Sequence, residues 1–173
     1  MSTELVEIIK PLTCLKGTWE GGGRAVFPTH DEFAYEDIMR FKLIERAFDK
    51  EPLIHFEEIA WVVNKGERAF KHWETGYFKP EPDGSIQLYV CHNTGRIEVT
   101  YGTLKSVDSG TKSLEMVFIS ESIRNDKGTK VALSSRREFL LNDDTLVYRV
   151  EMSTKEVPDM THHLSAELVK KNS

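Results

Sequence analysis

The sequence predicts an all-β protein, an antiparallel up-and-down barrel of about ten strands with a short N-terminal helix. Apolar and polar side chains alternate along most of the chain, which is typical of strands with one buried face. Turn-forming Gly, Pro, Asn and Asp residues interrupt this alternation at short intervals. The chain has 173 residues, of which 39% are hydrophobic, and this is enough for one sizeable core. We therefore expect residues 1–173 to form a single domain.

The helix is predicted at the start of the chain, over Thr3–Lys10. Thr3 can cap its first turn, and the apolar residues that follow have helical spacing. Pro11 is expected to end the helix. An element of this length can cover one end of a barrel.

The strands follow one another with short connections, as in a meander. Their predicted ranges are Leu15–Gly21, Phe33–Ile44, Leu53–Val63, Glu67–Phe78, Ser85–His92, Arg96–Leu104, Ser113–Ser120, Lys130–Leu141, Thr145–Ser153 and His162–Lys171. Such a meander tends to close, because closure removes the exposed sheet edges. A barrel of eight or more strands leaves room for a small ligand. The pattern thus favours a barrel with an internal pocket over a filled sandwich.

Composition and charge exclude several classes of protein. The formal net charge is −5 and the pI is about 5.7, which disfavours binding to nucleic acid. No apolar run approaches the roughly 18 residues of a membrane helix, and the N-terminus has no secretory signal. Cys14 and Cys91 lack the spacing of a zinc site or a disulfide framework. We expect a cytoplasmic protein that binds neither nucleic acid nor membranes.

The most specific local feature is the segment Gly17–Thr29, which is rich in glycine. Its glycines let the backbone bend sharply, or lie against a flat ligand without an intervening side chain. A phosphate-binding loop is excluded, because Pro28 and Thr29 lead toward another strand and not into a Gly-Lys-Ser helix start. A glycine-rich barrel corner, with Trp19 plugging one end, is the structural alternative.

The histidines are the main candidates for metal chemistry. His55, His72 and His92 lie on successive predicted strands and can converge as a facial metal triad, or remain ordinary half-buried rings. His162 and His163 open the last strand, from which one ring can reach the barrel mouth as an axial ligand. The residues alone favour a surface role for both. Serine and cysteine catalysis has no supporting motif.

Several motifs together resemble one known family. The glycine segment, read as Gly17-x-Trp19-x-Gly21-x-Gly23-x-Ala25-x-Phe27-Pro28-Thr29, is similar to the nitrobindin motif GxWxGxGxGxYPT. Further matches are Trp73–Phe78, Pro82–Gly84, Asn93–Gly95 and Met160–Leu168. They occur in the family's order, and the resemblance spans residues 11–171.

The resemblance implies a calycin-type barrel, similar to fatty-acid-binding proteins, that holds heme b with ferric iron at one end. It implies His163 as the axial ligand, because the family's ligand directly precedes a Leu, and Thr29 as a heme contact. The implied activities are nitric oxide binding and the isomerisation of peroxynitrite to nitrate, with no catalytic residue beyond the iron. We assign Arg137 to a heme propionate, because guanidinium and carboxylate pair well.

Met39, Phe41 and Leu133 are candidates for the apolar wall of the pocket, or plain core residues. The chain departs from the family pattern at Ala25, which replaces a glycine, and at Phe27, which replaces a tyrosine.

The choice of ligand conflicts with strict alternation along the last strand. Alternation places His162, and not His163, on the face of Leu164 and Ala166. We expect His163 to be the ligand because the first residues of a strand often depart from the ladder, with His162 as the alternative.

Two other functions fit the same barrel. A carrier of a small apolar ligand without heme can hold a carboxylate with Arg137 and Tyr148. The second of these functions is a partner-binding module whose barrel interior is empty. Separately, two copies of the barrel can pair as a homodimer. For the heme-binding function, the expected binding partner is a small-molecule ligand, either nitric oxide or peroxynitrite.

Overall fold

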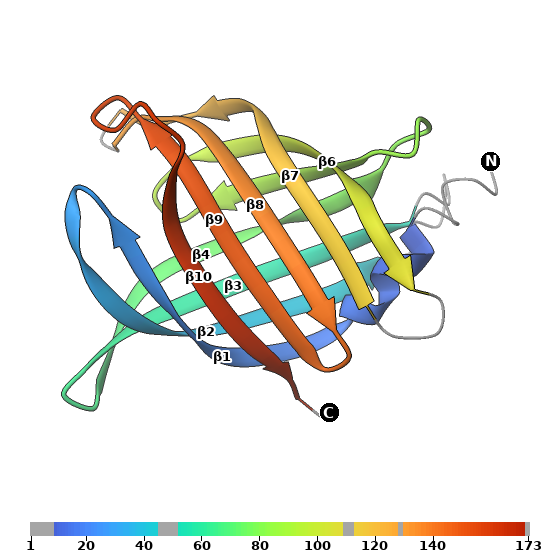
Figure 1. Cartoon of the computed structure of the whole chain (residues 1–173), viewed down its shortest axis with the longest axis horizontal. Helices are drawn as coiled ribbons and strands as arrows, with labels where there is room; N and C mark the ends of the chain where they lie inside the picture. The colour runs from blue at the N-terminus through green and yellow to red at the C-terminus, as the bar shows by residue number, and fades with distance from the viewer. Residues whose placement is uncertain (1–8, 45–51, 109–112, 128–129, 172–173) are drawn as a thin grey trace.

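The structure, a computed structural model, describes residues 9–44, 52–108, 113–127 and 130–171. Ten antiparallel strands form a closed barrel in which each strand pairs with its neighbours in sequence and the last pairs with the first (Figure 1). The strands are β1 (Gly17–Phe27), β2 (His30–Ile44), β3 (Leu53–Asn64), β4 (Glu67–Pro80), β5 (Ile86–His92), β6 (Ile97–Asp108), β7 (Ser113–Arg124), β8 (Ala132–Asn142), β9 (Thr145–Thr154) and β10 (Thr161–Lys170). The predicted fold class is confirmed.

A short 3-10 helix, η1 (Lys10–Leu15), covers one end of the barrel, which we call the helix end (Figure 1). Most of the helix predicted over Thr3–Lys10 lies outside the described residues. Pro11, which was expected to end that helix, lies in the first turn of η1, where its missing N–H costs nothing. Leu15 is fully buried, and its carbonyl accepts a hydrogen bond of 2.7 Å from Trp19 Nε1. Within the described part of the chain, no helix has the length and apolarity to cross a membrane.

The first strand is longer than predicted, because the glycine segment continues it to Phe27. A Cβ atom on Gly21 would lie 2.0 Å from the carbonyl oxygen of Glu167, and one on Gly23 would lie 2.2 Å from that of Ser165. Both carbonyls belong to β10, the strand that closes the barrel against β1. The glycines therefore permit a close approach of β1 and β10, and we call this strand pair the closing seam of the barrel.

Apolar side chains fill the half of the barrel next to the helix end. Phe56, Phe78, Phe118 and Phe139 are almost completely buried, and their ring centroids lie 5.5 to 6.1 Å apart in edge-on contacts. Any ligand-binding function is therefore expected at the opposite end, which we call the His163 end. This end carries the turns that follow β1, β3, β5, β7 and β9.

The three predicted wall residues have different positions. Met39 and Phe41 are buried and belong to the core cluster. Leu133 is 51% exposed, so its assignment to the interior is wrong. The cause is a register shift next to it on β8, which breaks the alternation of inward and outward side chains.

Candidate functional site

A layer of polar side chains crosses the interior between the apolar half and the His163 end. The register of the sheet places Glu58 on β3 directly opposite Glu74 on β4, and Glu74 directly opposite His92 on β5. All three side chains are buried. Strand pairing therefore collects three titratable groups in one row on the inner wall.

Arg137 reaches this row from β8, on the other side of the barrel. Its Nη1 donates to Glu74 Oε1 at 2.6 Å and its Nη2 donates to Glu74 Oε2 at 3.0 Å, a bidentate pair. Its Nε lies 3.4 Å from Glu98 Oε2, and Nη1 also contacts the Tyr148 hydroxyl. The assignment of Arg137 to a heme propionate stays a prediction.

The ion pairs decide which of the buried carboxyl groups are ionised. Burial alone would raise the pKa of Glu74, but the Arg137 guanidinium and the His92 ring hold that pKa well below its usual range. The pKa of Glu98 is lowered in the same way, against burial, by Arg137 and by a hydrogen bond from His92. Burial lowers the pKa of His92. At neutral pH the layer thus contains two carboxylates and a neutral imidazole.

Asp37 and Glu58 show the opposite behaviour. Burial, together with the nearby Glu74, raises the pKa of Asp37 to about 8. Burial and the charges of Asp37 and Glu74 raise the pKa of Glu58 well above its usual range. Neither carboxylate oxygen of Asp37 has a hydrogen-bond partner among the described residues. Both groups are therefore expected to be protonated near neutral pH.

We expect Asp37→Asn to stabilise the protein increasingly as the pH rises from 5 to about 8, and by a nearly constant amount above that pH. A carboxyl group with a raised pKa binds its proton more tightly in the folded state, so its favourable contribution is lost as the pH rises toward about 8. The gain in unfolding free energy should grow by up to about 1.4 kcal/mol per pH unit within this window. Urea unfolding at pH 5, 7 and 9 measures it. Asp83→Asn, at an exposed turn, is the control, and a difference that does not vary with pH contradicts the prediction.

A β-bulge at the start of β10 gives the two adjacent histidines different surroundings. His162 pairs with Glu151 and Leu164 pairs with Val150, so His163 is an extra residue in the ladder. As a result His162 is exposed, whereas His163 is partly buried and Leu164 packs against the core. The alternation that favours His162 fails because the bulge shifts its phase by one residue.

His163 has the surroundings of an available metal ligand. Phe27 contacts its ring edge-on with centroids 5.4 Å apart, and the ring of His30 lies 6.1 Å away. Its Nδ1 atom is buried and has no hydrogen-bond partner among the described residues. Burial, assisted by the charge of Arg96, lowers its pKa to about 4. The imidazole is therefore neutral at neutral pH, the form that binds metals.

Thr29 lies at the same end as His163. It is exposed in the turn between β1 and β2, and its hydroxyl accepts a hydrogen bond of 3.0 Å from Lys130 Nζ. Phe27, two residues before it, connects this turn to the His163 ring. The structure thus brings Thr29 and His163 to one rim, whereas Arg137 lies deeper in the polar layer.

The three histidines considered as a metal triad do not all meet. The rings of His72 and His92 lie with centroids 5.3 Å apart inside the barrel. His55 lies on the outer face of β3, where its Nε2 contacts Thr75 Oγ1 at 2.8 Å. The third group beside His72 and His92 is Glu74, which sequence reasoning missed. Its position two residues after His72, on the same face of a strand, was the available signal.

A family model described as "THAP4-like, heme-binding beta-barrel domain" matches residues 8–170. The chain belongs to this family. It is the nitrobindin family that the sequence motifs indicate, and it is defined as a heme-binding barrel domain.

Individual proteins extend the comparison. A protein of Arabidopsis thaliana named "Peroxynitrite isomerase Rv2717c" is 36% identical over 162 residues, which cover 94% of this chain and 88% of the relative. The "Peroxynitrite isomerase" of Nocardia farcinica is 32% identical, covering 92% of this chain and 89% of the relative. The crystal structure of Rv2717c from M. tuberculosis superimposes with a TM-score of 0.82 at 23% identity, over 95% of this chain and 98% of that one. The last comparison supports the fold.

Proposed function

We propose that this chain binds heme b at the His163 end, with His163 as the axial ligand, and that it binds nitric oxide there and isomerises peroxynitrite to nitrate. The observation that carries the proposal is the partly buried, neutral imidazole of His163, whose buried Nδ1 atom has no hydrogen-bond partner among the described residues. The family is defined by heme binding, and the relatives' names supply the proposed reaction.

The residues around His163 fit a heme. Phe27 offers an apolar ring beside the ligand, and Thr29 and Lys130 supply polar groups on the rim. The aromatic cluster fills the helix-end half, so a porphyrin would be held at the His163 end. Arg137 can pair with a propionate only if its guanidinium exchanges Glu74 or Glu98 for that group.

A heme iron with one protein ligand would keep its sixth coordination position open for a small molecule. The protein contributes the lone pair of His163, which no proton occupies above about pH 4. Burial, assisted by the charge of Arg96, keeps the pKa of this imidazole low.

A carrier of a small apolar acid fits less well. Its carboxylate would need the Arg137 guanidinium and the Tyr148 hydroxyl, but these two groups already contact each other and Glu74. The heme proposal requires no such exchange at the iron ligand.

Stopped-flow decay of peroxynitrite, with nitrate measured as the product, tests the proposed reaction. We expect the protein loaded with one equivalent of hemin to accelerate decay and raise the nitrate yield, and the heme-free protein to do neither. His163→Ala, treated identically, should lose most of the acceleration because hemin is no longer held by its ligand. His162→Ala should keep it, because that side chain is exposed. Equal acceleration by His163→Ala would contradict the proposal.

A further inference from the structure

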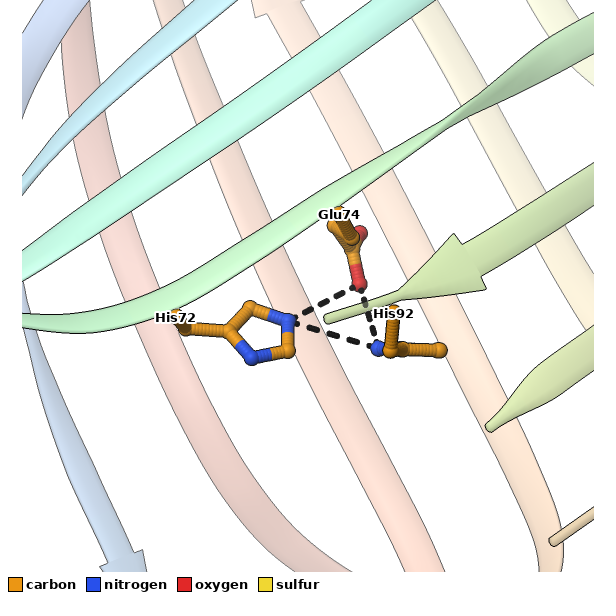
Figure 2. Close-up of side chains that lie close together, drawn as sticks. All are labelled: His72, Glu74 and His92. Atoms are coloured by element: carbon orange, nitrogen blue, oxygen red, sulfur yellow. Dashed lines mark hydrogen bonds and ion pairs between the residues drawn. The ribbon is translucent and has the colours of Figure 1, made fainter. Parts of the chain in front are cut away.

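His72, Glu74 and His92 form a compact cluster on the inner wall of β4 and β5 (Figure 2). Their arrangement follows from the sheet: His72 and Glu74 are two residues apart on one face of β4, and His92 is directly opposite Glu74 on β5. Glu74 and His92 are buried, and His72 is 26% exposed.

The three atoms that face one another have the spacing of metal ligands. Glu74 Oε2 lies 3.2 Å from His92 Nδ1 and 3.4 Å from His72 Nε2, and the two nitrogens are 3.3 Å apart. A tetrahedral zinc site with ligands at 2.0–2.1 Å has ligand-to-ligand edges of about 3.3–3.4 Å. The cluster therefore already has the dimensions of one face of such a tetrahedron.

Two of the three atoms face each other as hydrogen-bond acceptors. His92 Nε2 lies 3.0 Å from Glu98 Oε1, and because a carboxylate only accepts, this nitrogen carries the ring proton. The other nitrogen, Nδ1, then presents a lone pair to Glu74 Oε2, another acceptor, at 3.2 Å. The donors that reach these two atoms are guanidinium groups, Arg96 Nη2 at 3.4 Å from Nδ1 and Arg137 Nη2 at 3.0 Å from Oε2. His72 Nε2 has at most one proton to share between them. A cation at the centre of the triangle satisfies all three atoms.

The surrounding groups also match a metal centre. The contact of Glu98 with His92 is a carboxylate–histidine pair of the kind that fixes the tautomer of a metal-bound imidazole. Arg137 holds the Glu74 carboxylate in place through its bidentate pair. Arg96 Nη2 lies 3.4 Å from His92 Nδ1 and must turn away from the ring when a metal binds, while its Nε stays 2.8 Å from Glu98 Oε1.

We propose that His72, Glu74 and His92 bind one divalent transition-metal ion of the zinc type inside the barrel. The set of two imidazoles and one carboxylate suits Zn²⁺ and Co²⁺, and three protein ligands leave a fourth position for water or a small anion. The proposed metal site does not rest on the heme proposal, because none of its three ligands is His163.

Cobalt titration of the heme-free full chain, after removal of metals with a chelator, tests the site. We expect visible Co²⁺ absorption to saturate at one ion per chain and Zn²⁺ to displace it. His92→Gln and His72→Gln should weaken binding by at least about 100-fold, because loss of an outer-shell partner alone costs about 10–100-fold. His55→Gln, which changes a histidine on the outer face, should bind Co²⁺ like the unchanged protein.

Circular dichroism of each variant checks that the barrel is intact. If His92→Gln does not fold, the partly exposed His72→Gln decides the outcome. His163→Ala should retain full Co²⁺ binding, which separates this site from the heme ligand. Absence of saturable cobalt absorption, equal affinity in a folded His72→Gln or His92→Gln variant, or loss of binding in His163→Ala would overturn the proposal.

Discussion

Replacing Arg137 with Met is expected to lower the free energy of unfolding by about 3–5 kcal/mol at neutral pH. Arg137 is 2% exposed and is the bidentate partner of Glu74, so its removal leaves Glu74 as a buried charge without that partner. Glu98 also loses one of its two cationic neighbours and keeps Arg96. Urea unfolding followed by tryptophan fluorescence measures the loss. Because both carboxyl groups can take up protons when the guanidinium is absent, the loss should be smaller at pH 5 than at pH 8.

Arg136→Met is the matched control for this prediction. Arg136 is the next residue, and it forms ion pairs with Glu138 and Glu151 on the outer face, where its side chain is 30% exposed. Ion pairs of this kind contribute about 1 kcal/mol or less. If Arg136→Met and Arg137→Met lowered the free energy of unfolding equally, the buried Arg137–Glu74 pair would contribute no more to stability than an exposed ion pair, which contradicts the prediction.

Replacing Gly21 with Ala is expected to destabilise the barrel by about 4 kcal/mol or more, or to prevent folding. The new Cβ would lie 2.0 Å from the carbonyl oxygen of Glu167 and 2.9 Å from the Cα of Leu168, both backbone atoms of β10. Backbone atoms cannot rotate away as a side chain does, so the closing seam must separate locally. Thermal unfolding followed by circular dichroism measures the effect.

Gly22→Ala tests whether the effect belongs to the seam or to glycine itself. Gly22 is the adjacent residue and is exposed, and its nearest contact for a new Cβ is the carbonyl oxygen of Tyr35 at 3.0 Å. A shift of a few tenths of an ångström accommodates this contact, and Ala in a strand gains about 0.5–1 kcal/mol over Gly. We expect a net change within about 1 kcal/mol. A large loss in Gly22→Ala together with a small one in Gly21→Ala would contradict the seam explanation.

Much of the barrel could be predicted from the sequence because its strands alternate cleanly between buried and exposed residues. The predictions failed where local backbone geometry depends on a partner strand. The glycine segment was expected to leave the ladder after Gly21, and the need for glycine becomes visible only once β10 lies against β1. Leu133 was assigned to the interior because a register shift cannot be detected in the alternation of a single strand.

In the candidate site, too, some features could be predicted from the sequence and others depend on contacts between strands. The family motif indicates His163 without a structure, and the bulge explains physically why this ring and not His162 turns inward. Asp37, Glu58 and Glu74 could be recognised only as polar residues at inward positions. Their pairing with Arg137, and the resulting protonation states, depend on which strands face each other across the barrel.

A titration of the full chain with hemin, followed by Soret absorbance, tests most directly the claim that His163 binds a heme. The account predicts saturation at one hemin per chain for the unchanged protein and for His162→Ala, and no saturable Soret band for His163→Ala. Because the pKa of His163 is about 4, binding should be the same at pH 6 and pH 8. A Soret band unchanged in His163→Ala, or lost in His162→Ala, would contradict it.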